Sequence, residues 1–514
     1  MPSIIEETSH TVVDVAICGG GPTGLATALL LKRLGVSVYV VDAKPASLDL
    51  GRADAMNART QQYLEVANLL GELLPQGITC NTSSTFGDGE FKSRQNQWWV
   101  SLEHTLHRNF LMLGQPVIEK MLADKLGDDV HYNEQVVSIS EDEDGVNVVT
   151  SQGRTIRSKY ALGADGARSM VRKAIGATFT GTKPEMLWAV LDTYIDTDFP
   201  RCPEIITFQL NGQSRVSWIP RERDLCRFYV LLEGEVSLEL AQQSIKDHMA
   251  PHKVEFTKTE WYSTFDVKER IASTFLSRDG AGRIFLGGDA AHVHSVNGGQ
   301  GLNTGIADAF NLAWRLAMVV NQPEMDKEAA RRLLLSYDTE RRSTAQGVID
   351  VAAALVRDTV REAKTYVGTI EKNAGYITGM GVSYEACGSP LVQQSEHGIW
   401  KAGFRCPDMV IKPLSSGEEE EEERRLYSEV SYGKYLLLSV GKTEAAKLSG
   451  YPVTRYSVLP EGASAIAGVD NTYTADWAKA DDVFHVVVRP DMYIAFVSES
   501  LDACESHLNK VFQA

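Results

Sequence analysis

The order of apolar and polar positions predicts an α/β start to the chain. Residues 12–17 and 36–41 are mostly apolar runs of strand length, and residues 25–34 between them have helical spacing. Gly35 directly follows the helical pattern and ends the predicted helix. The pattern therefore predicts a strand–helix–strand unit at residues 12–41.

The later parts of the chain divide into a β-rich segment and a further α/β region. Short β-branched and aromatic runs fill residues 185–265, which predicts a mostly β segment inserted into an α/β chain. Residues 86–105 predict a β-hairpin. A last region starts near residue 385 and contains strand-like runs at 435–440 and 485–497. The same criteria predict helices at 116–126, 305–320 and 329–355 and strands at 146–150, 159–164 and 284–288.

Composition narrows the class of protein. The 514 residues are 43% hydrophobic and 23% charged, as in a soluble globular protein, and the length predicts about three domains. The formal net charge of −17 disfavours nucleic-acid binding. No apolar run approaches the ~18 residues of a membrane span, and the first residues do not resemble a secretory signal. Six glutamates in a row, 418–423, predict a solvated loop or helix start.

The seven cysteines are scattered and include no CxxC pair. This spacing favours reduced thiols and a cytoplasmic location over a disulfide framework or a zinc site. His292 and His294 are only two residues apart and have no ligand cluster nearby, so we expect no metal there.

A glycine-rich turn follows the first predicted strand. Gly19, Gly21 and Gly24 satisfy GxGxxG: the first permits a tight turn, the second lets backbone approach a pyrophosphate, and the third allows close helix packing. The helix start would offer N–H groups to phosphates. Asp42 follows Gly24 by 18 residues at the end of the second strand, where it can accept a hydrogen bond from a ribose hydroxyl. The turn predicts a dinucleotide but leaves NAD and FAD open.

Two further motifs decide between these cofactors. Residues 162–169 read LGADGARS, and residues 284–310 read IFLGGDAAHVHSVNGGQGLNTGIADAF. With GGGPTG at 19–24, they resemble the three fingerprints of the single-component (class A) FAD-dependent aromatic monooxygenases, the family of phenol hydroxylase and para-hydroxybenzoate hydroxylase. The segments 402–411 and 486–498 resemble the thioredoxin-like C-terminal domain of the phenol hydroxylase branch.

The resemblance implies an α/β fold: a Rossmann-like FAD-binding domain, an inserted mostly β substrate domain and a C-terminal thioredoxin-like domain. It implies bound FAD, with NAD(P)H as co-substrate. No second GxGxxG is present, which agrees with a family that has no separate nicotinamide domain, and the missing CxxC also disfavours a disulfide reductase. The implied domains are 1–184 (FAD-binding, first part, with 86–105 contributing to the substrate sheet), 185–265 (substrate domain), 266–385 (return of the FAD-binding domain and long helices) and 386–514 (C-terminal domain).

The resemblance also implies cofactor-binding residues at the second and third motifs. Asp289 matches an aspartate that hydrogen-bonds the FAD ribitol. The loop and helix start bring backbone N–H groups to the flavin edge where negative charge accumulates on reduction. Asp165 belongs to a motif associated with FAD and NAD(P)H, and Arg168 would steer the nicotinamide phosphates. The residues of the loop and helix start are Gly299, Gly301, Leu302 and Asn303.

Each of these assignments has a purely structural alternative. Asp165 could instead cap a helix at 167–175, and GGQG could be an ordinary helix start. Arg52 and Gln115 match positions that touch FAD phosphate or ribose, but they could be a surface arginine and a helix-start glutamine. Val296 stands where many relatives have proline close to the flavin.

Asp54, Arg227 and Tyr229 resemble the active-site set of phenol hydroxylase. Arg227 and Tyr229 are two residues apart, so on a strand they point to the same face. We expect Asp54 to act as general base, Tyr229 to hydrogen-bond the substrate oxygen, and Arg227 to be an electrostatic or flavin-gating partner. The alternative is a structural ion pair of Asp54 with Arg227 or with Arg59. Trp98, Trp99 and Trp218 line an aromatic pocket or pack in a core.

The resemblance implies an FAD-dependent monooxygenase that uses NAD(P)H and O₂ to hydroxylate a phenol-like aromatic through a flavin C4a-hydroperoxide. The alternative within this chemistry is epoxidation or Baeyer–Villiger oxidation of a non-phenolic substrate, such as an indole or a polyketide-derived compound. Other classes are an NAD-linked dehydrogenase and a non-catalytic binding protein. We expect a small aromatic substrate, no nucleic acid and no membrane, and a C-terminal region that is structural or dimer-forming.

Overall fold

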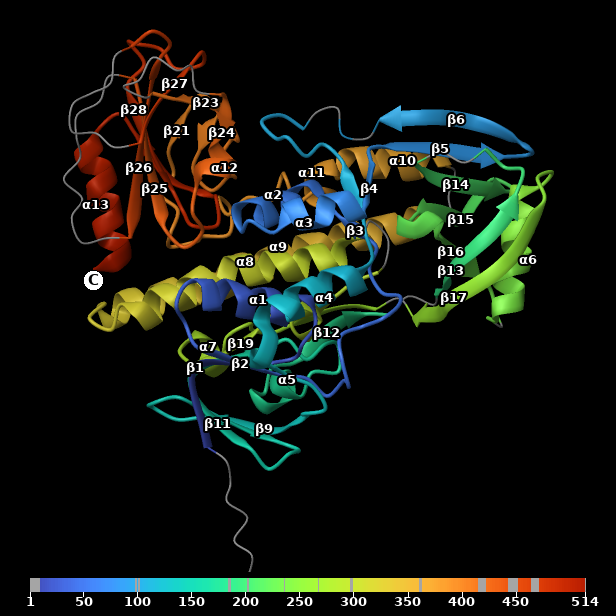
Figure 1. The fold of residues 1–514 in the computed structure, drawn as a ribbon, viewed down its shortest axis with the longest axis horizontal. Coiled ribbons are helices and arrows are strands. Elements are labelled where there is room, and N and C mark those ends of the chain that lie inside the picture. The colour runs from blue at the N-terminus through green and yellow to red at the C-terminus, as the bar shows by residue number, and fades with distance from the viewer. Residues whose placement is uncertain are drawn as a thin grey trace, which may run out of the picture.

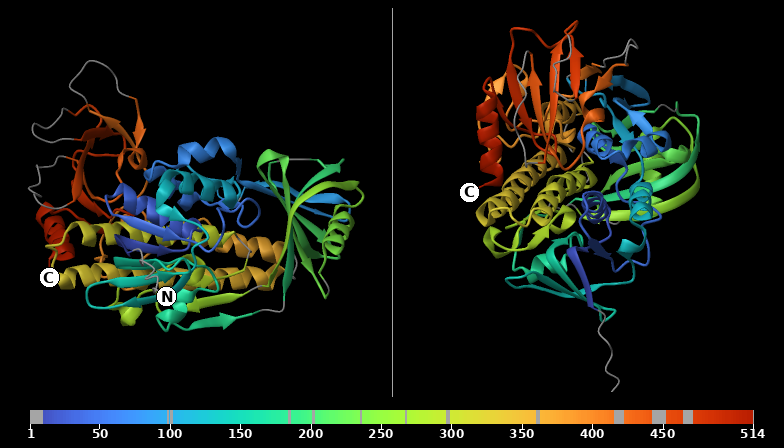
Figure 2. Two further views of the ribbon diagram at one scale, coloured as in Figure 1. Left: turned by 60° about the horizontal axis from the view of Figure 1, so that its bottom comes forward. Right: turned by 60° about the vertical axis from the view of Figure 1, so that its left-hand side comes forward.

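A computed structural model describes residues 10–97, 99, 102–183, 186–200, 203–234, 236–266, 268–295, 299–359, 363–414, 422–441, 452–463 and 471–513. Within these residues the fold is mixed α/β, and three seven-stranded sheets surround a layer of long helices. Figures 1 and 2 show the helices α8 and α9 between the first sheet and the C-terminal sheet. The middle sheet stands at one end of the helices. No helix among the described residues combines the length and apolarity that crossing a bilayer requires.

The first sheet contains the predicted strand–helix–strand unit. Helix α1 (Pro22–Arg33) connects two parallel neighbours, β1 and β2, which confirms that prediction. The antiparallel pair β9 and β10 extends one edge of the sheet. The strands, in spatial order, are β8 (Val130–His131), β2 (Val38–Val41), β1 (His10–Cys18), β11 (Thr155–Gly163), β10 (Val146–Thr150) and β9 (Val136–Glu141), with β19 (Ile284–Leu286) also on β11.

The middle sheet joins residues from two distant parts of the chain. Its last two strands form a hairpin at 82–97, somewhat before the predicted 86–105, and they pair with a strand from residues 205–210. Its core is separate from the large core that the first sheet shares with α8. The strands, in order, are β17 (Val254–Asp266), β13 (Leu187–Thr197), β16 (Cys226–Leu232), β15 (Gln213–Pro220), β14 (Ile205–Leu210), β5 (Thr82–Gly87) and β6 (Glu90–Gln97).

Helix α6 (Leu238–Met249) lies within the segment that was predicted to be mostly β. Ala241, Ile245 and Met249 are buried at four-residue spacing, and they pack in the core of the middle sheet. The hydroxyl of Ser237 accepts a hydrogen bond from the Leu240 N–H and caps the helix. Both signals are local, so the sequence contained the information for this helix.

Two long helices form the central layer, α8 (Gln300–Asn321) and α9 (Lys327–Thr359). Helix α8 begins at Gln300, five residues before the predicted start at 305, since residues 300–304 are also helical. Gly305 is required there: a Cβ would lie 2.3 Å from Oγ1 of Thr23 in α1. This close contact fixes the start of α8 against the glycine turn of the first sheet.

The C-terminal sheet packs against the other side of the helical layer, with α13 (Leu501–Phe512) beside it. The apolar run at 485–497 forms two strands joined by a turn at 489–493, and this turn carries charged residues into the helical layer. Glutamates 418–421 lie outside the described residues. The strands, in order, are β24 (Arg424–Arg425), β23 (Val410–Pro413), β27 (Thr472–Ala475), β26 (Val453–Pro460), β25 (Tyr435–Val440), β28 (Phe484–Val488) and β29 (Ile494–Ser498).

Shorter elements connect these layers. One three-stranded sheet contains β3 (Ala55–Met56), β7 (Phe110–Met112) and β4 (Ile78–Cys80), and another contains β12 (Phe179–Thr182), β18 (Glu269–Ala272) and β20 (His292–Val293). A two-stranded sheet contains β21 (Glu396–His397) and β22 (Trp400–Lys401). The shorter helices are α2 (Ala58–Val66), α3 (Leu70–Leu73), α4 (Gln115–Leu126), α5 (Met170–Ala174), α7 (Ser277–Gly280), α10 (Ala363–Lys372), α11 (Ala374–Ile377) and α12 (Leu426–Glu429).

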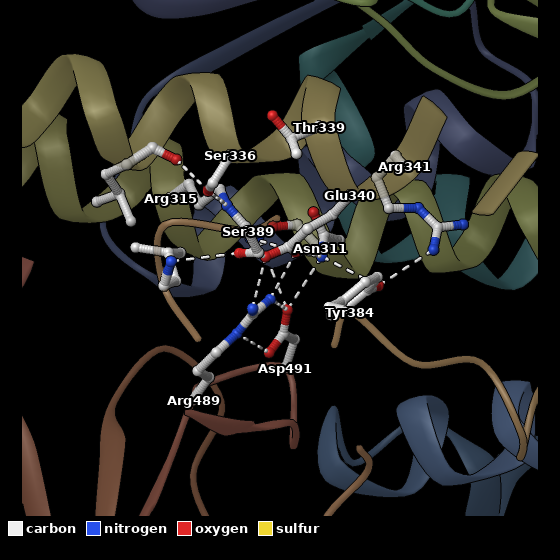
Figure 3. Close-up of polar contacts among 12 residues, drawn as sticks. Asn311, Arg315, Ser336, Thr339, Glu340, Arg341, Tyr384, Ser389, Arg489 and Asp491 are labelled. Atoms are coloured by element: carbon white, nitrogen blue, oxygen red, sulfur yellow. Dashed lines mark hydrogen bonds and ion pairs between the residues drawn. The ribbon is translucent and has the colours of Figure 1, made fainter. Parts of the chain in front are cut away.

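A buried charge cluster connects α8, α9 and the turn between β28 and β29 (Figure 3). Glu340 of α9 accepts hydrogen bonds from both terminal nitrogens of Arg489, at 2.6 and 2.8 Å, and from Arg315 of α8 at 2.7 Å. Arg489 also donates to both carboxylate oxygens of Asp491, at 3.0 and 2.5 Å. All four side chains are buried, so each charge depends on the others for compensation.

Arginine partners keep Glu340 ionised. Burial alone would raise the pKa of Glu340, but Arg489 and Arg315 outweigh burial and hold the pKa below its ordinary 4.5. A carboxyl whose pKa is lower in the folded state stabilises the fold above its unfolded pKa. This stabilisation is lost as the pH falls from about 4.5 through the lower folded value.

We therefore expect Glu340→Gln to reduce the free energy of unfolding by about 3–5 kcal/mol at pH 7, because two buried guanidinium groups lose a carboxylate. Chemical denaturation would measure the change. The stabilities of the wild type and the variant should converge as the pH falls below 4.5. Glu328→Gln on an exposed part of α9 is the matched control and should change stability little. Equal stability of Glu340→Gln and the wild type at pH 7 would contradict the role given to this cluster.

Candidate cofactor and substrate site

The three glycines of the first turn have different surroundings. A Cβ on Gly19, whose φ is +122°, would lie 2.2 Å from the carbonyl oxygen of Ala164. A Cβ on Gly24 would lie 1.9 Å from the carbonyl oxygen of Gly19. A Cβ on Gly21 would meet no atom within 4 Å, and no side chain caps α1 at this residue. Two of the glycines are thus required by the chain's own packing, whereas Gly21 leaves open space at a helix start.

Asp42 lies at the end of β2 and contacts this turn. Its Oδ2 accepts a hydrogen bond from the Gly20 N–H at 2.6 Å, and its Oδ1 accepts one from the Lys44 N–H at 2.7 Å. The carboxylate therefore holds the turn in shape. Its role toward a ribose hydroxyl stays a prediction.

Arg52 and Gln115 lie on two neighbouring segments. Arg52 is exposed and has a φ of +68°. Gln115 begins α4; its Oε1 accepts a hydrogen bond from the Ala53 N–H at 3.3 Å, and its amide donates to Glu119 at 2.7 Å. Gln115 thus ties the loop at 52–53 to α4, and contact of either residue with FAD stays a prediction.

Asp165 caps a helix, as the structural alternative expected. Its carboxylate accepts hydrogen bonds from the Ser169 hydroxyl at 2.5 Å and from the Met170 and Val171 N–H groups at 2.7 and 3.1 Å. The helix is α5, which begins at Met170 and not at the predicted residue 167. The side chain of Arg168 is exposed, and its predicted contact with nicotinamide phosphates stays a prediction.

Asp289 is exposed in the turn after β19, and a buried aspartate holds that turn. Oδ2 of Asp308 accepts a hydrogen bond from the Gly288 N–H at 2.9 Å and lies 2.8 Å from Nε2 of His292. Nε of Arg341 donates to Oδ1 of Asp308 at 2.7 Å. Sequence reasoning missed Asp308 and Arg341, although Asp308 lies within the third motif. In the described part of the chain, no group of three His, Cys, Asp or Glu residues could hold a metal ion.

The start of α8 presents an uncapped helix N-terminus. Gly299 is in the left-handed conformation with a φ of +63°, and no side chain of the described residues caps the helix there. A Cβ on Gly301 would meet no atom within 4 Å. The first N–H groups of a helix have no intrahelical partner and carry its positive dipole end, which favours an anionic or electron-rich ligand. Val296 to Gly298 lie outside the described residues.

The side chains of the next two predicted residues serve the protein's own packing. Leu302 is buried in the large core. Asn303 accepts a hydrogen bond from the Asn57 N–H at 2.9 Å and donates to the carbonyl oxygens of Ala55 and Gly299 at 3.0 and 2.6 Å. Asn303 positions the helix start, and contact of either residue with a flavin stays a prediction.

The structure brings Asp54, Arg227 and Tyr229 together. The Tyr229 hydroxyl donates to Oδ2 of Asp54 at 3.2 Å, and a terminal nitrogen of Arg227 lies 3.5 Å from the same oxygen. Arg227 also donates to the backbone oxygen of Arg52. The ion pair of Asp54 with Arg227, weighed as an alternative, is thus present. Arg59 instead contacts the C-terminal layer, so an Asp54–Arg59 pair is not formed.

Asp192 of β13 is the residue of this group that sequence reasoning missed. Arg227 donates to its two carboxylate oxygens, both at 2.7 Å, and the two residues are directly opposite in neighbouring strands. The available signal in the sequence was an aspartate inside the apolar run LWAVLDTYI. The structure shows that this aspartate is buried, and a buried charge needs a partner. Burial alone would lower the pKa of Arg227, but Asp54, Tyr229 and Asp192 outweigh it and raise the pKa. Burial and Asp54 raise the pKa of Tyr229, so its hydroxyl is a neutral donor at neutral pH.

The described tryptophans pack in cores. Trp218 stacks on Phe228 with 5.6 Å between ring centroids, and Trp99 packs against Phe110 at 5.4 Å. Both are buried, which supports the packing alternative over an aromatic pocket. Trp98 lies outside the described residues.

Comparisons with known proteins agree with this geometry. The family described as "FAD binding domain" matches residues 12–352. Phenol 2-monooxygenase of Aspergillus fumigatus is 30% identical over 402 residues, which cover 72% of this chain and 66% of that protein. Two monooxygenases of Aspergillus terreus are matched over 53% and 61% of their length, so the chain spans less than two thirds of these relatives.

Other relatives match almost the whole chain. Rifampicin monooxygenase of Streptomyces venezuelae is 28% identical over 510 residues, covering 95% of this chain and 96% of that protein. The crystal structure of the flavin-dependent monooxygenase PieE with FAD and substrate has a TM-score of 0.77 and 19% identity, and it covers 98% of this chain and 99% of its own. The family match covers more than half of the chain, and the chain therefore belongs to the FAD binding domain family, that of the class A flavoprotein monooxygenases.

Proposed function

We propose that the protein uses NAD(P)H and O₂ to hydroxylate a phenol-like aromatic compound with FAD as its bound cofactor. The observation that carries this proposal is the group of Tyr229 with the buried residues Asp54, Arg227 and Asp192. In this group a carboxylate, a neutral hydroxyl donor and a fixed cation lie within hydrogen-bonding or ion-pair distance. The names of two relatives, phenol 2-monooxygenase and 3-hydroxybenzoate 4-monooxygenase, support the substrate class.

The residues of the chain fit FAD at two helix starts. Gly21 at α1 and Gly301 at α8 both leave open space where a Cβ would stand, and neither helix has a side-chain cap. We assign the pyrophosphate to the start of α1 and the electron-rich edge of the flavin to the start of α8. When bound, FAD supplies electron transfer from NAD(P)H and activation of O₂. The proposed polar contacts of FAD are those of Asp42, Arg52, Gln115, Asp165 and Asp289.

The chain's own residues would prepare the substrate. Oδ2 of Asp54 is engaged by Tyr229 and Arg227, so Oδ1 is the atom that would accept the proton of a phenolic hydroxyl. A phenolate is more nucleophilic at its ring carbons than a phenol, which is what an electrophilic oxygen donor requires. Asp192 fixes the guanidinium of Arg227, and Arg227 would balance the negative charge while Tyr229 binds the substrate oxygen.

We also propose a separate role for each layer of the fold. The sheet built from 187–266 and the hairpin at 82–97 has its own core and carries Arg227 and Tyr229, which supports a substrate-covering domain over 185–265 with 86–105 contributing. The region 386–514 would be a thioredoxin-like domain without redox function, since it lacks CxxC. It would be structural or dimer-forming, in a cytoplasmic enzyme whose FAD-binding parts are 1–184 and 266–385.

The first test concerns the binding of FAD. We expect the purified protein to show two visible flavin bands and to release FAD on denaturation, as identified by chromatography. Gly21→Ala should leave the thermal stability of the apoprotein unchanged and weaken FAD binding, because its Cβ enters space that is otherwise open. Gly24→Ala is the contrasting variant and should destabilise the apoprotein itself, because its Cβ meets the Gly19 backbone. A colourless protein that does not rebind FAD would refute the proposal.

The second test concerns the proposed role of Asp54 as general base. Asp54→Asn should lower kcat for a phenol by about 10²–10⁴-fold, the usual contribution of a general base, with the FAD spectrum unchanged. A phenol already ionised at the assay pH should lose much less, since no base is needed. Asp49→Asn, an exposed aspartate on the same loop, is the matched control. Unchanged turnover of un-ionised phenols by Asp54→Asn would favour epoxidation or Baeyer–Villiger oxidation instead.

A further inference from the structure

A cavity lies away from the Asp54 group, where α2, α8 and α9 meet the C-terminal layer. It is a small cavity with a volume of about 30 Å³, and it is partly open to solvent. Its walls include Arg59 and Tyr63 of α2, Val348 of α9, and Tyr493 from the turn between β28 and β29. Its lining includes Asn303, which positions the start of α8, but none of Asp54, Arg227, Tyr229 and Asp192.

Arg59 is a buried cation that forms no ion pair with any carboxylate in the described part of the chain. Only 2% of the residue is exposed. Its terminal nitrogens donate to uncharged groups: the Gln62 side chain at 2.8 Å, the Tyr427 hydroxyl at 3.0 Å, and the carbonyl oxygens of Asp491 and Met492 at 3.1 and 3.3 Å. Among the described residues, its Nε–H has no hydrogen-bond partner.

Most other buried arginines in the described part of the chain are paired with carboxylates. Arg227 lies 2.7 Å from Asp192, Arg315 lies 2.7 Å from Glu340, and Arg489 lies 2.6 Å from Glu340. Arg341, which also lines the cavity, lies 2.7 Å from Asp308. Arg172 is the other exception: it is 4% exposed, it donates to the carbonyl oxygens of Ala290 and Ala167, and its guanidinium carbon lies 3.8 Å from the ring centre of Phe179, but it does not line this cavity. The lining residues include two arginines and no carboxylate, so Arg59 leaves the cavity with one uncompensated positive charge.

Aromatic faces compensate this charge only in part. The guanidinium carbon of Arg59 lies 4.5 Å from the ring centre of Tyr63 and 4.9 Å from that of Tyr493. Cation–π contacts contribute about 0.5–2 kcal/mol each, whereas an unpaired buried charge costs several kcal/mol. A bound anion would remove this imbalance and satisfy the free Nε–H.

We propose that this cavity binds a small monovalent anion, a halide or a short carboxylate, on Arg59. One charge is expected because Arg341 is already neutralised by Asp308, so a dianion would remain half-compensated. Ala307, Val348 and Val382 provide apolar wall beside the cation, which accommodates the methyl group of acetate or the low hydration of a halide. The anion would join α2 to the C-terminal layer.

The test measures thermal unfolding and binding heat of the FAD-loaded full chain. Sodium chloride and sodium acetate are titrated separately at constant ionic strength, with sodium gluconate, whose anion is too large for the cavity, as the balancing salt. We expect a saturable rise in Tm and a measurable heat with at least one of the two anions. Binding of chloride alone assigns a halide site, and binding of acetate alone assigns a carboxylate site.

Two variants locate the site. Arg59→Gln should weaken anion binding by about tenfold or more, because a charged hydrogen-bond partner is lost. Since Arg59 also contacts the C-terminal layer, Val348→Phe gives a second route: it fills the cavity and should abolish binding with Arg59 in place. Val351→Phe, a buried valine on α9 that is not among the cavity's lining residues, is the control and should bind the anion as the wild type does.

The outcomes that overturn the proposal are specific. Equal behaviour in chloride, acetate and gluconate would show that ring faces and carbonyl oxygens alone neutralise Arg59. Anion binding that survives both Arg59→Gln and Val348→Phe would place the anion elsewhere. Neither result bears on the monooxygenase proposal, which depends on FAD and Asp54.

Discussion

This structure depends on one constraint: charged side chains that are buried away from water must compensate one another. Glu340, Arg315, Arg489 and Asp491 are buried where α8, α9 and the C-terminal layer meet, and two positive charges are balanced by two negative charges (Figure 3). Such a group is stable only when every member is present and in register, because removing one leaves an uncompensated charge in a medium of low polarity. The cluster therefore specifies how the C-terminal layer docks on the helices, in addition to the apolar contacts there.

The same rule organises the two ends of the candidate site. Asp308 of α8 holds the turn after β19, His292 and Arg341 together, and it thereby ties that turn to α8. At the other end, Asp192 fixes Arg227, so this cation stays beside Asp54 whether or not a substrate is present. At both places, a buried carboxylate that is not itself proposed to contact FAD or substrate holds a neighbouring part of the candidate site.

Close backbone packing complements these ion pairs. Gly24 against Gly19, and Gly305 against Thr23, bring α1 and α8 so near the turn of the first sheet that no side chain would fit. Gly21 and Gly301 are different, because open space adjoins them at two uncapped helix starts. Arg59 has no carboxylate partner among the described residues, and this makes the cavity beside it a candidate anion site.

Local patterns in the sequence determined the strand–helix–strand unit, the glycine turn, the long helices and the pairing of Arg227 with Tyr229 on one strand face. These features arise from spacing over a few residues: periods of 2 and 3.6, and glycines at fixed offsets. Helix α6 was also encoded locally, by its cap and its four-residue spacing, and was missed within a β-rich context. Only the tertiary structure decided which buried charges meet, such as Asp192 with Arg227 and Glu340 with Arg489. These partners are far apart in the chain, and the desolvation that forces them to pair exists only after the layers have come together.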